Sequence, residues 1–266
     1  MKERPYVGVT GLSSRLEVAK TLYKGFSQTN LSIESERIPM IGFLVSLKTL
    51  NRLPTENLRY PNIKILRELW QESKYFAFNT VHYNTQETKA LSEQVITIFA
   101  QGIYDRDYLQ GLQFNMKWPD RHELLKVKRV MPDLKIIISV FGGILKESTP
   151  QEVAQKIESY GLLVDYLLLD PSGGQGKTFE AKDVVPYFQS LRDKFPNLAL
   201  GVAGGFTGEN VGSRVRELIL ELGITDFSID AEGGLRDKVS PKYGDDLFNL
   251  EKTVSYIKAA DQAFIR

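Results

Sequence analysis

YLLLDPSGGQGKTFEAKDVVPYFQSLRDKF, residues 166–195, contains one complete copy of the unit that decides the fold. The apolar run Tyr166–Asp170 has the length of a buried strand, and a glycine-rich loop follows it. From Lys182 to Phe195 apolar residues recur at helical spacing and form one face, made of Val184, Val185, Phe188 and Leu191. A strand, a loop and an amphipathic helix in this order are typical of a parallel sheet built from βα units.

The same unit recurs along the whole chain. Eight short β-branched or aromatic runs predict strands at Tyr6–Thr10, Ile38–Val45, Tyr75–Val81, Gly111–Asn115, Lys135–Val140, Tyr166–Asp170, Leu198–Ala203 and Asp226–Asp230. Strands that alternate with about eight helices predict an α/β fold, a (β/α)8 TIM barrel that forms a single domain over residues 1–266. An open doubly wound sheet, which would use fewer strands, is the alternative architecture.

Capping residues mark several helix starts. Ser13 or Ser14 is placed to cap the first helix, and Thr85 to open the helix that carries Leu91, Val95 and Ile98. Pro119-Asp120 and Thr149-Pro150 open two further helices in the same way. Later helices are predicted over residues 208–222 and 250–264.

The composition excludes several classes of function. Lys and Arg number 34 against 33 Asp and Glu, so no basic field favours nucleic acid. The absence of cysteine excludes disulfides, thiolate metal sites and a cysteine nucleophile. With two separated histidines and no calcium-type loop, we expect no metal and no cofactor. The N-terminal residues lack a signal-peptide pattern and no apolar run reaches 18 residues, so we expect a cytoplasmic protein without membrane contact.

The letters GQGKT in the opening stretch suggest a P-loop, but the spacing excludes one. A Walker A loop needs a glycine separated by four residues from its Gly-Lys pair, and at that position this chain has Pro171, which fixes φ and lacks an N–H. The remaining loop has Gly173, Gly174, Gly176 and Lys177, and its backbone can move or lie close against a ligand. Barrel active sites use this face, so we expect these residues to bind substrate; the alternative is a loop that needs glycine only for its bends.

Two more glycine pairs follow the last two predicted strands, in AGGFTGENV (203–211) and DAEGGL (230–235). In barrels the loops after strands seven and eight often form a phosphate site, because backbone N–H groups and a helix N-terminus attract an anion. We therefore predict a phosphate site lined by Gly204, Gly205, Phe206, Thr207, Gly233 and Gly234. Tight turns without a ligand are the alternative.

These motifs resemble phosphoribosylanthranilate isomerase, a ribulose-phosphate-binding barrel. Asp170 with GGQGKTF is similar to the family's strand-end aspartate and its GG-x-GK-x-F loop, and AGGFTGENV is similar to its GGL-x-x-ENV phosphate loop. SIDAEGG (228–234) stands where the family has VDVSSG, and the strongest similarity covers Leu167–Leu235. In the first half, VGVTG (7–11), IGFLVSLKTLNR (41–52) and LQFN (112–115) are fainter matches to VKICG, to the region of a substrate-binding arginine and to VQLH.

The resemblance implies an Amadori-type conversion of an aldose to a ketose on a phosphorylated small-molecule substrate. A general acid opens the ribose ring and a general base removes the C2 proton. Asp170 matches the family's general acid, and burial at a barrel mouth can raise a carboxyl pKa toward neutrality. The alternative role for Asp170 is to cap its loop.

The family's base is missing. Thr10 stands where the family has its base cysteine, and a threonine hydroxyl does not ionise near pH 7. His82, just beyond the third predicted strand, and Asp230, on the eighth, are the other catalytic candidates; each has a packing or bracing role as its alternative. His122, in a helical first turn, is expected to face solvent.

Two cationic residues follow the second strand. Arg52, with Lys48, is a candidate for binding a carboxylate or a second phosphate, and a solvated charged loop is the alternative. A lyase or aldolase would want a strand lysine, but Lys135 begins its strand at the far end from the site. A non-catalytic relative that binds a phosphorylated metabolite stays open because of Thr10, as does a homodimer.

Overall fold

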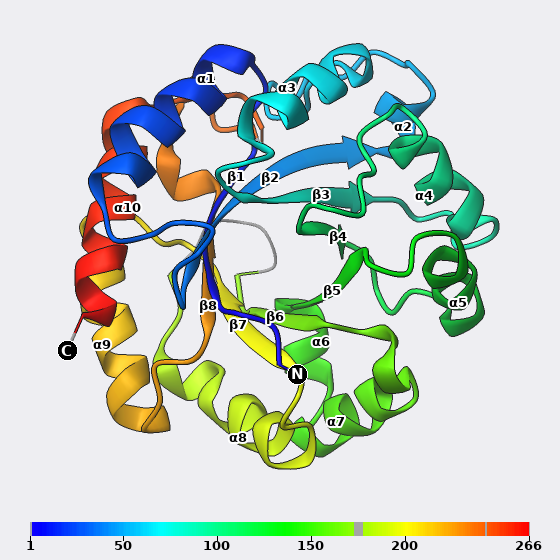
Figure 1. Cartoon of the computed structure of the whole chain (residues 1–266). Helices are drawn as coiled ribbons and strands as arrows, with labels where there is room; N and C mark the ends of the chain where they lie inside the picture. The colour runs from blue at the N-terminus through cyan, green and yellow to red at the C-terminus, as the bar shows by residue number, and fades with distance from the viewer. Residues whose placement is uncertain (1, 173–177, 243, 266) are drawn as a thin grey trace.

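The strands close into a ring. The computed structural model describes residues 2–172, 178–242 and 244–265. In these residues eight parallel strands form a closed barrel in which each strand pairs with its neighbour in sequence and β1 pairs with β8 (Figure 1). The strands are β1 Tyr6–Thr10, β2 Ile38–Ser46, β3 Phe78–Asn84, β4 Gln110–Phe114, β5 Lys135–Phe141, β6 Tyr166–Asp170, β7 Ala199–Ala203 and β8 Ser228–Ala231. The predicted (β/α)8 barrel is confirmed, and the open sheet is excluded.

Helices surround the barrel (Figure 1). They are α1 Arg15–Lys20, α2 Leu47–Leu50, α3 Leu66–Ser73, α4 Leu91–Phe99, α5 Arg121–Val130, α6 Gly142–Glu147, α7 Pro150–Glu158, α8 Val185–Lys194, α9 Val211–Leu222 and α10 Leu250–Phe264. The predicted caps Ser14, Asp120 and Thr149 each accept a hydrogen bond from a backbone N–H in the first turn. No helix in the described ranges has the length and apolar character needed to cross a bilayer.

Several predicted boundaries differ from the structure, and two of the differences have a clear local cause. The Thr85 hydroxyl accepts a hydrogen bond from the Glu87 N–H at 3.0 Å and closes a local turn, so α4 begins only at Leu91. β3 begins at Phe78 rather than Tyr75, because the Ser73 carbonyl accepts from the N–H groups of residues 76 and 77 and ends α3 in a turn. The shift puts His82 inside β3 instead of beyond it.

Successive side chains along each strand point alternately out of and into the barrel, and they form two separate hydrophobic cores. Side chains such as Val7 and Val9 point outward and pack with the helices in the larger core. Inward-facing side chains form a second core inside the barrel. There Tyr6, Phe78 and Tyr166 form an aromatic layer, with ring centroids 5.5 to 6.0 Å apart. This aromatic layer fills the end of the barrel where the strands begin.

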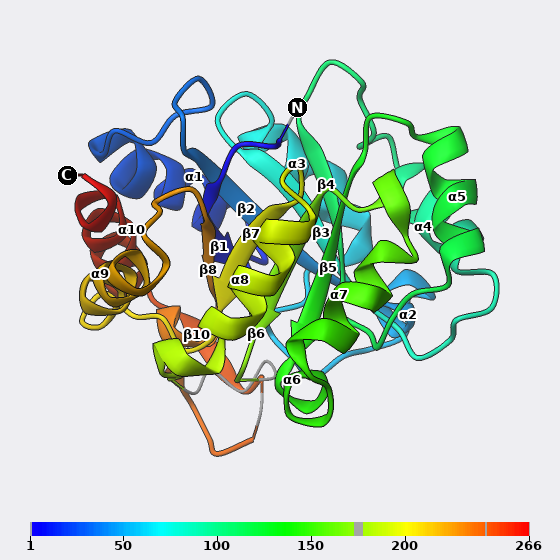
Figure 2. The ribbon, with the colours of Figure 1, turned by 90° about the horizontal axis from the view of Figure 1, so that it is seen from below.

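The inward positions become polar toward the carboxyl ends of the same strands. We call them the polar layer, and its members are Thr10, His82, Gln113, Ser139, Asp170 and Asp230, none more than 8% exposed. Figure 2 shows that this end lies opposite the N-terminus, on the side of α6 and β10. The polar layer therefore forms the floor of the face that carries active sites in barrel enzymes.

A hairpin and an ion-pair network close one side of this face. β9 (Arg236–Lys238) and β10 (Asp246–Phe248) pair antiparallel between β8 and α10. Arg59, from the segment between α2 and α3, and Arg236 both donate to the Asp246 carboxylate. Burial alone would raise the pKa of Asp246, but the hydrogen bonds from the two arginines outweigh it and lower that pKa. The network fixes the hairpin against the barrel mouth.

Candidate active site

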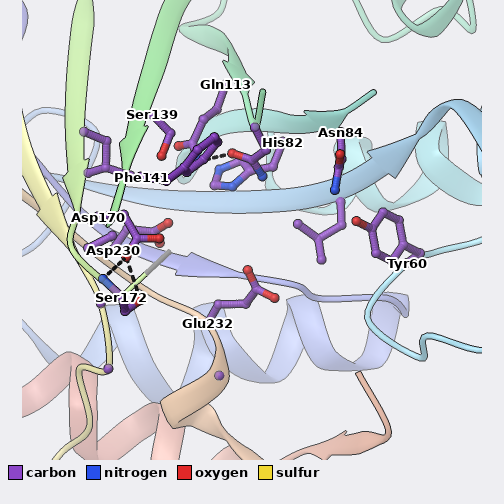
Figure 3. Close-up of a pocket in the computed structure, with 17 residues that line it drawn as sticks. Tyr60, His82, Asn84, Gln113, Ser139, Phe141, Asp170, Ser172, Asp230 and Glu232 are labelled. Carbon is purple, nitrogen blue, oxygen red and sulfur yellow. Dashed lines mark hydrogen bonds between the residues drawn. The ribbon is translucent and has the colours of Figure 1, made fainter. Parts of the chain in front are cut away.

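A cavity of about 270 Å3 opens at the carboxyl ends of the strands. Figure 3 shows side chains from β3, β4, β5, β6 and β8 around it. The polar-layer residues in its lining are His82, Gln113, Ser139, Asp170 and Asp230, and the glycine loops after β7 and β8 contribute Gly204, Gly205 and Gly233. The topology thus brings together residues that are far apart in the sequence.

Asp170 lies at the end of β6 and is 8% exposed. Its carboxylate accepts hydrogen bonds from the Ser172 N–H at 3.0 Å and from the Ser172 hydroxyl at 2.6 Å (Figure 3). A Cβ placed on Gly204 would lie 3.3 Å from Asp170 Oδ1, so the loop after β7 runs directly beside this carboxylate. Asp170 therefore braces its own loop and also borders the cavity.

Asp230, at the end of β8, is linked to Thr10 on the neighbouring strand β1. The Thr10 hydroxyl lies 2.9 Å from Oδ1 and 3.1 Å from Oδ2 of Asp230, and it donates to this carboxylate. Burial raises the pKa of Asp230 to about 8, and the charges of Glu232 and Asp170 add to the rise, although the bond from Thr10 opposes it. Asp230 is consequently a carboxyl group that exchanges its proton near neutral pH.

His82 lies in the wall of the same cavity and is 1% exposed. Its Nε2 is 2.9 Å from the Thr80 hydroxyl, and burial lowers its pKa to about 3. The imidazole is therefore neutral at pH 7 and is suited to a hydrogen bond rather than to charge. A Cβ on Gly42 would lie 2.4 Å from Thr10 Oγ1 and 2.8 Å from His82 Nε2, so glycine at this β2 position leaves the room that both side chains occupy.

The loops after β7 and β8 bring their backbones together. Gly204 and Gly205 have φ angles of 124° and 60°, which glycine adopts without strain. Asn210 holds this loop, because its amide donates to the Gly205 carbonyl at 2.9 Å. A Cβ on Gly234 would lie 2.0 Å from the Phe206 carbonyl oxygen, so the two loops touch where only glycine fits.

Most of the other residues predicted to bind phosphate or substrate do not line the cavity in the part of the chain that the structure describes. Phe206 is buried and its ring packs edge-on against that of Phe179, with the ring centroids 5.5 Å apart. Thr207 accepts from the Asn210 N–H and does not line the cavity, nor does Gly234. Gly173, Gly174, Gly176 and Lys177 lie outside the described residues.

The structure does not bring Arg52 to the cavity. Arg52 and Lys48 are exposed, and neither belongs to the described lining. His122 is exposed at the start of α5, and Lys135 pairs with Glu3 where β5 begins. No cluster of three or more His, Asp or Glu side chains with metal-binding geometry occurs in the part of the chain that the structure describes.

Several residues at the mouth were missed by sequence reasoning. Glu232 lines the cavity and pairs with Arg59 at 2.5 Å, and Tyr60 and Asn84 form the side away from Asp170 (Figure 3). Arg59 and Asp246 are 187 positions apart, so no local pattern links them. Gln113 and Ser139 carry a weak signal, since each is the polar inward position near the end of an apolar strand.

The fold and the polar layer at its carboxyl-terminal face define an enzyme-like (β/α)8 barrel. No protein-family model matches the sequence, and no curated protein matches it. Solved structures do match over nearly the whole chain, at a sequence identity that shows the fold alone.

Two of these structures are phosphoribosylanthranilate isomerases. The enzyme from Thermus thermophilus is 15% identical with a TM-score of 0.58, and the match covers 97% of this chain and 98% of that one. The enzyme from Pyrococcus furiosus is 16% identical with a TM-score of 0.56, over 97% and 100% of the two chains. The catalytic domain of a chitinase from Pyrococcus furiosus is 14% identical with a TM-score of 0.56, over 100% of this chain and 97% of that one. The fold similarity to phosphoribosylanthranilate isomerase agrees with the resemblance in the motifs.

Proposed function

We propose that this protein binds a phosphosugar and catalyses its isomerisation, or a related proton transfer, with Asp170 as general acid. The observation that carries the proposal is that Asp170 and Asp230 border one cavity together with the glycine loops after β7 and β8. Two carboxyl groups beside glycine-rich loops can supply the acid, the base and the anion-binding backbone for proton transfer on a sugar phosphate.

The glycine loops hold the phosphate in this proposal. Gly204, Gly205 and Gly233 carry no side chains that would keep a phosphate from the backbone N–H groups, and α9 begins six residues after Gly205. A helix N-terminus and convergent N–H groups stabilise an anion without a lysine or arginine. The phosphate would thereby place the sugar carbons over the polar layer.

The two carboxyl groups divide the proton transfers. Asp170 donates a proton to the ring oxygen as the bond between that oxygen and C1 breaks, and the lone pair of the oxygen or nitrogen substituent on C1 forms a double bond to C1. Asp230 accepts the C2 proton, and the resulting enol or enamine tautomerises to the ketose. A carboxylate whose pKa is raised to about 8 is a far stronger base than an ordinary aspartate, and the Thr10 hydroxyl holds it in place. Asp230 thus occupies the role for which the isomerase family uses a cysteine at the position of Thr10.

The pH dependence tests Asp230 as base. A base acts in its deprotonated form, so the rate rises with pH until the pKa of about 8 is passed. For an open-chain aldose phosphate, which needs no ring opening by Asp170, we expect the rate of C2 proton removal to increase through pH 7 and to level off above pH 8. A rate that falls across this range would contradict the assignment.

Proton exchange tests the chemistry without knowledge of the final product. Aldose phosphates, beginning with ribose 5-phosphate, are incubated with the protein in deuterium oxide, and loss of the C2 proton signal is followed by NMR. We expect exchange that falls by about 100-fold or more in Asp170→Asn, the lower range for a lost general acid. Asp193→Asn, on the exposed part of α8, is the matched control and should retain full exchange. Exchange that survives Asp170→Asn would remove Asp170 from the mechanism.

Thr10 also supports a second candidate function, a non-catalytic protein that binds a phosphorylated metabolite. The chain has no cysteine, so the isomerase family's own base is absent. Binding of ribose 5-phosphate without any C2 exchange would favour this candidate. Absence of binding would reject both, because a ligand at 100 times its Kd should add about 2.7 kcal/mol to the free energy of unfolding.

A further inference from the structure

One buried acceptor in the wall of the cavity lacks a partner. Gln113, on β4, is 4% exposed, and its amide nitrogen donates to Asn115 Oδ1 at 2.9 Å. The carboxamide oxygen of Gln113 has no hydrogen-bond partner among the described residues, although the side chain lines the cavity. Unsatisfied buried acceptors are uncommon and destabilising, so this oxygen is placed for a donor that the chain does not supply.

Ser139 lies on β5, the strand that pairs with β4. It is 3% exposed and lines the same cavity, and its hydroxyl makes no hydrogen bond within the described part of the chain. Figure 3 shows Gln113 and Ser139 on one side of the cavity, apart from Ser172 and Glu232. A serine hydroxyl both donates and accepts, so the two side chains together match a ligand hydroxyl.

The charged groups around the cavity also favour a ligand that carries hydroxyl groups. Asp170, Asp230 and Glu232 line it, and among the described residues its lining contains no lysine or arginine. Arg59, a nearby buried arginine, donates to Glu232 and Asp246. A second carboxylate on the ligand would therefore meet hydrogen-bond acceptors and no cationic partner among the described lining residues, whereas hydroxyl groups would find partners.

We infer that Gln113 and Ser139 form a hydroxyl-binding subsite, and that the substrate is a phosphosugar whose second end is an uncharged polyhydroxy chain instead of a carboxylated aromatic ring. This inference rests on the proposed phosphate site at the glycine loops. A substrate hydroxyl donates to Gln113 Oε1 and accepts from Ser139, while the carboxyl groups of the polar layer face the reacting carbons. The subsite sets specificity and takes no part in proton transfer.

Binding of three phosphate esters distinguishes a contribution of this subsite from that of the proposed phosphate site. Glycerol 3-phosphate occupies the glycine loops alone, ribitol 5-phosphate adds a polyhydroxy chain, and its N-(2-carboxyphenyl)amino derivative adds a carboxylated ring. Calorimetric titration of the wild-type protein should give binding of all three, with ribitol 5-phosphate the tightest. Equal affinity for the first two esters, or tightest binding of the carboxylated derivative, would overturn the subsite. Binding of none would instead reject the proposed phosphate site.

Variants test the two side chains directly. Gln113→Leu removes the acceptor at similar volume, and we expect the affinity for ribitol 5-phosphate to fall by about fivefold to tenfold, as for one lost neutral hydrogen bond. Ser139→Ala should have a smaller effect in the same direction, and it tests the subsite if the first variant does not fold. Affinity for glycerol 3-phosphate should stay unchanged in both variants. A uniform loss for all esters, or no loss for ribitol 5-phosphate, would contradict the subsite.

Discussion

The two ends of the barrel interior are built on the same strands for opposite purposes. Where the strands begin, the rings of Tyr6, Phe78 and Tyr166 pack together. Four residues further along β6, and toward the ends of β3 and β8, the inward positions are Asp170, His82 and Asp230. Burial of aromatic rings stabilises the fold, whereas burial of ionisable groups opposes it. The aromatic layer thus supports a polar layer whose residues are retained at the expense of stability.

The pKa shifts in the polar layer show how the effect of these buried groups on stability depends on pH. Asp230 keeps its proton in the folded state up to about pH 8, whereas an unfolded aspartate loses it near pH 3.8. The free energy of unfolding therefore falls as pH rises between these values. His82 acts in the other direction, because the unfolded imidazole takes up a proton below about pH 6.5 and the folded one only near pH 3. Its contribution to stability is lost as pH falls through that window.

The largest effect on stability is expected in the aromatic layer. Tyr166→Ala removes a ring that packs on two others, and we expect a loss of about 3–5 kcal/mol in urea unfolding. Tyr23→Ala, at an exposed position, is the matched control and should change little. In a Tyr166 variant that still folds, binding of ribose 5-phosphate should survive. A small loss of stability would show that the two layers do not differ in the way described.

A substitution in the polar layer should raise the stability of the protein instead of lowering it. Asp230→Asn removes the group that must ionise in a buried site, so we expect the variant to gain roughly 2–4 kcal/mol over the wild type at pH 9 and far less at pH 4. Proton exchange at C2 should be lost in the same variant. Unfolding curves across this pH range are the measurement, and an equal difference at both ends would contradict the raised pKa.

The contact between the glycine loops should give a smaller effect. Gly234→Ala places a Cβ 2.0 Å from the Phe206 carbonyl oxygen, so the loops must move apart. We expect a loss of about 1–3 kcal/mol in stability, as for overpacking, together with weaker phosphate binding. Gly143→Ala is the control, since its Cβ would meet nothing within 4 Å. Unchanged phosphate affinity in Gly234→Ala would show that these loops do not bind the phosphate.

Arg52 should have the smallest effect. It is exposed and outside the described lining of the cavity. We expect Arg52→Ala to stay within about 0.5 kcal/mol of the wild type in stability and to leave ester affinities unchanged. A tenfold loss of affinity in this variant would contradict that expectation and would support a role for Arg52 in binding an anionic group of the ligand.

Local patterns in the sequence were sufficient for the barrel and for part of the site. Two strands were predicted to the residue, because alternation and turn residues act locally. The shift of β3 was not predictable in this way, since the aromatic run at Tyr75 packs against Tyr108 on the surface instead of entering the sheet. Arg59 and Asp246 meet only through tertiary structure, and the unpaired oxygen of Gln113 becomes visible only once its surroundings are known.

A crystal structure of the protein grown in high phosphate tests the central claim most directly. We expect phosphate density within hydrogen-bonding distance of the backbone N–H groups in the loops of Gly204-Gly205 and Gly233-Gly234. The same density should leave the space between Asp170 and Gln113 open for the sugar. Phosphate bound elsewhere, with these loops empty, would contradict the assignment of the site and the function proposed from it.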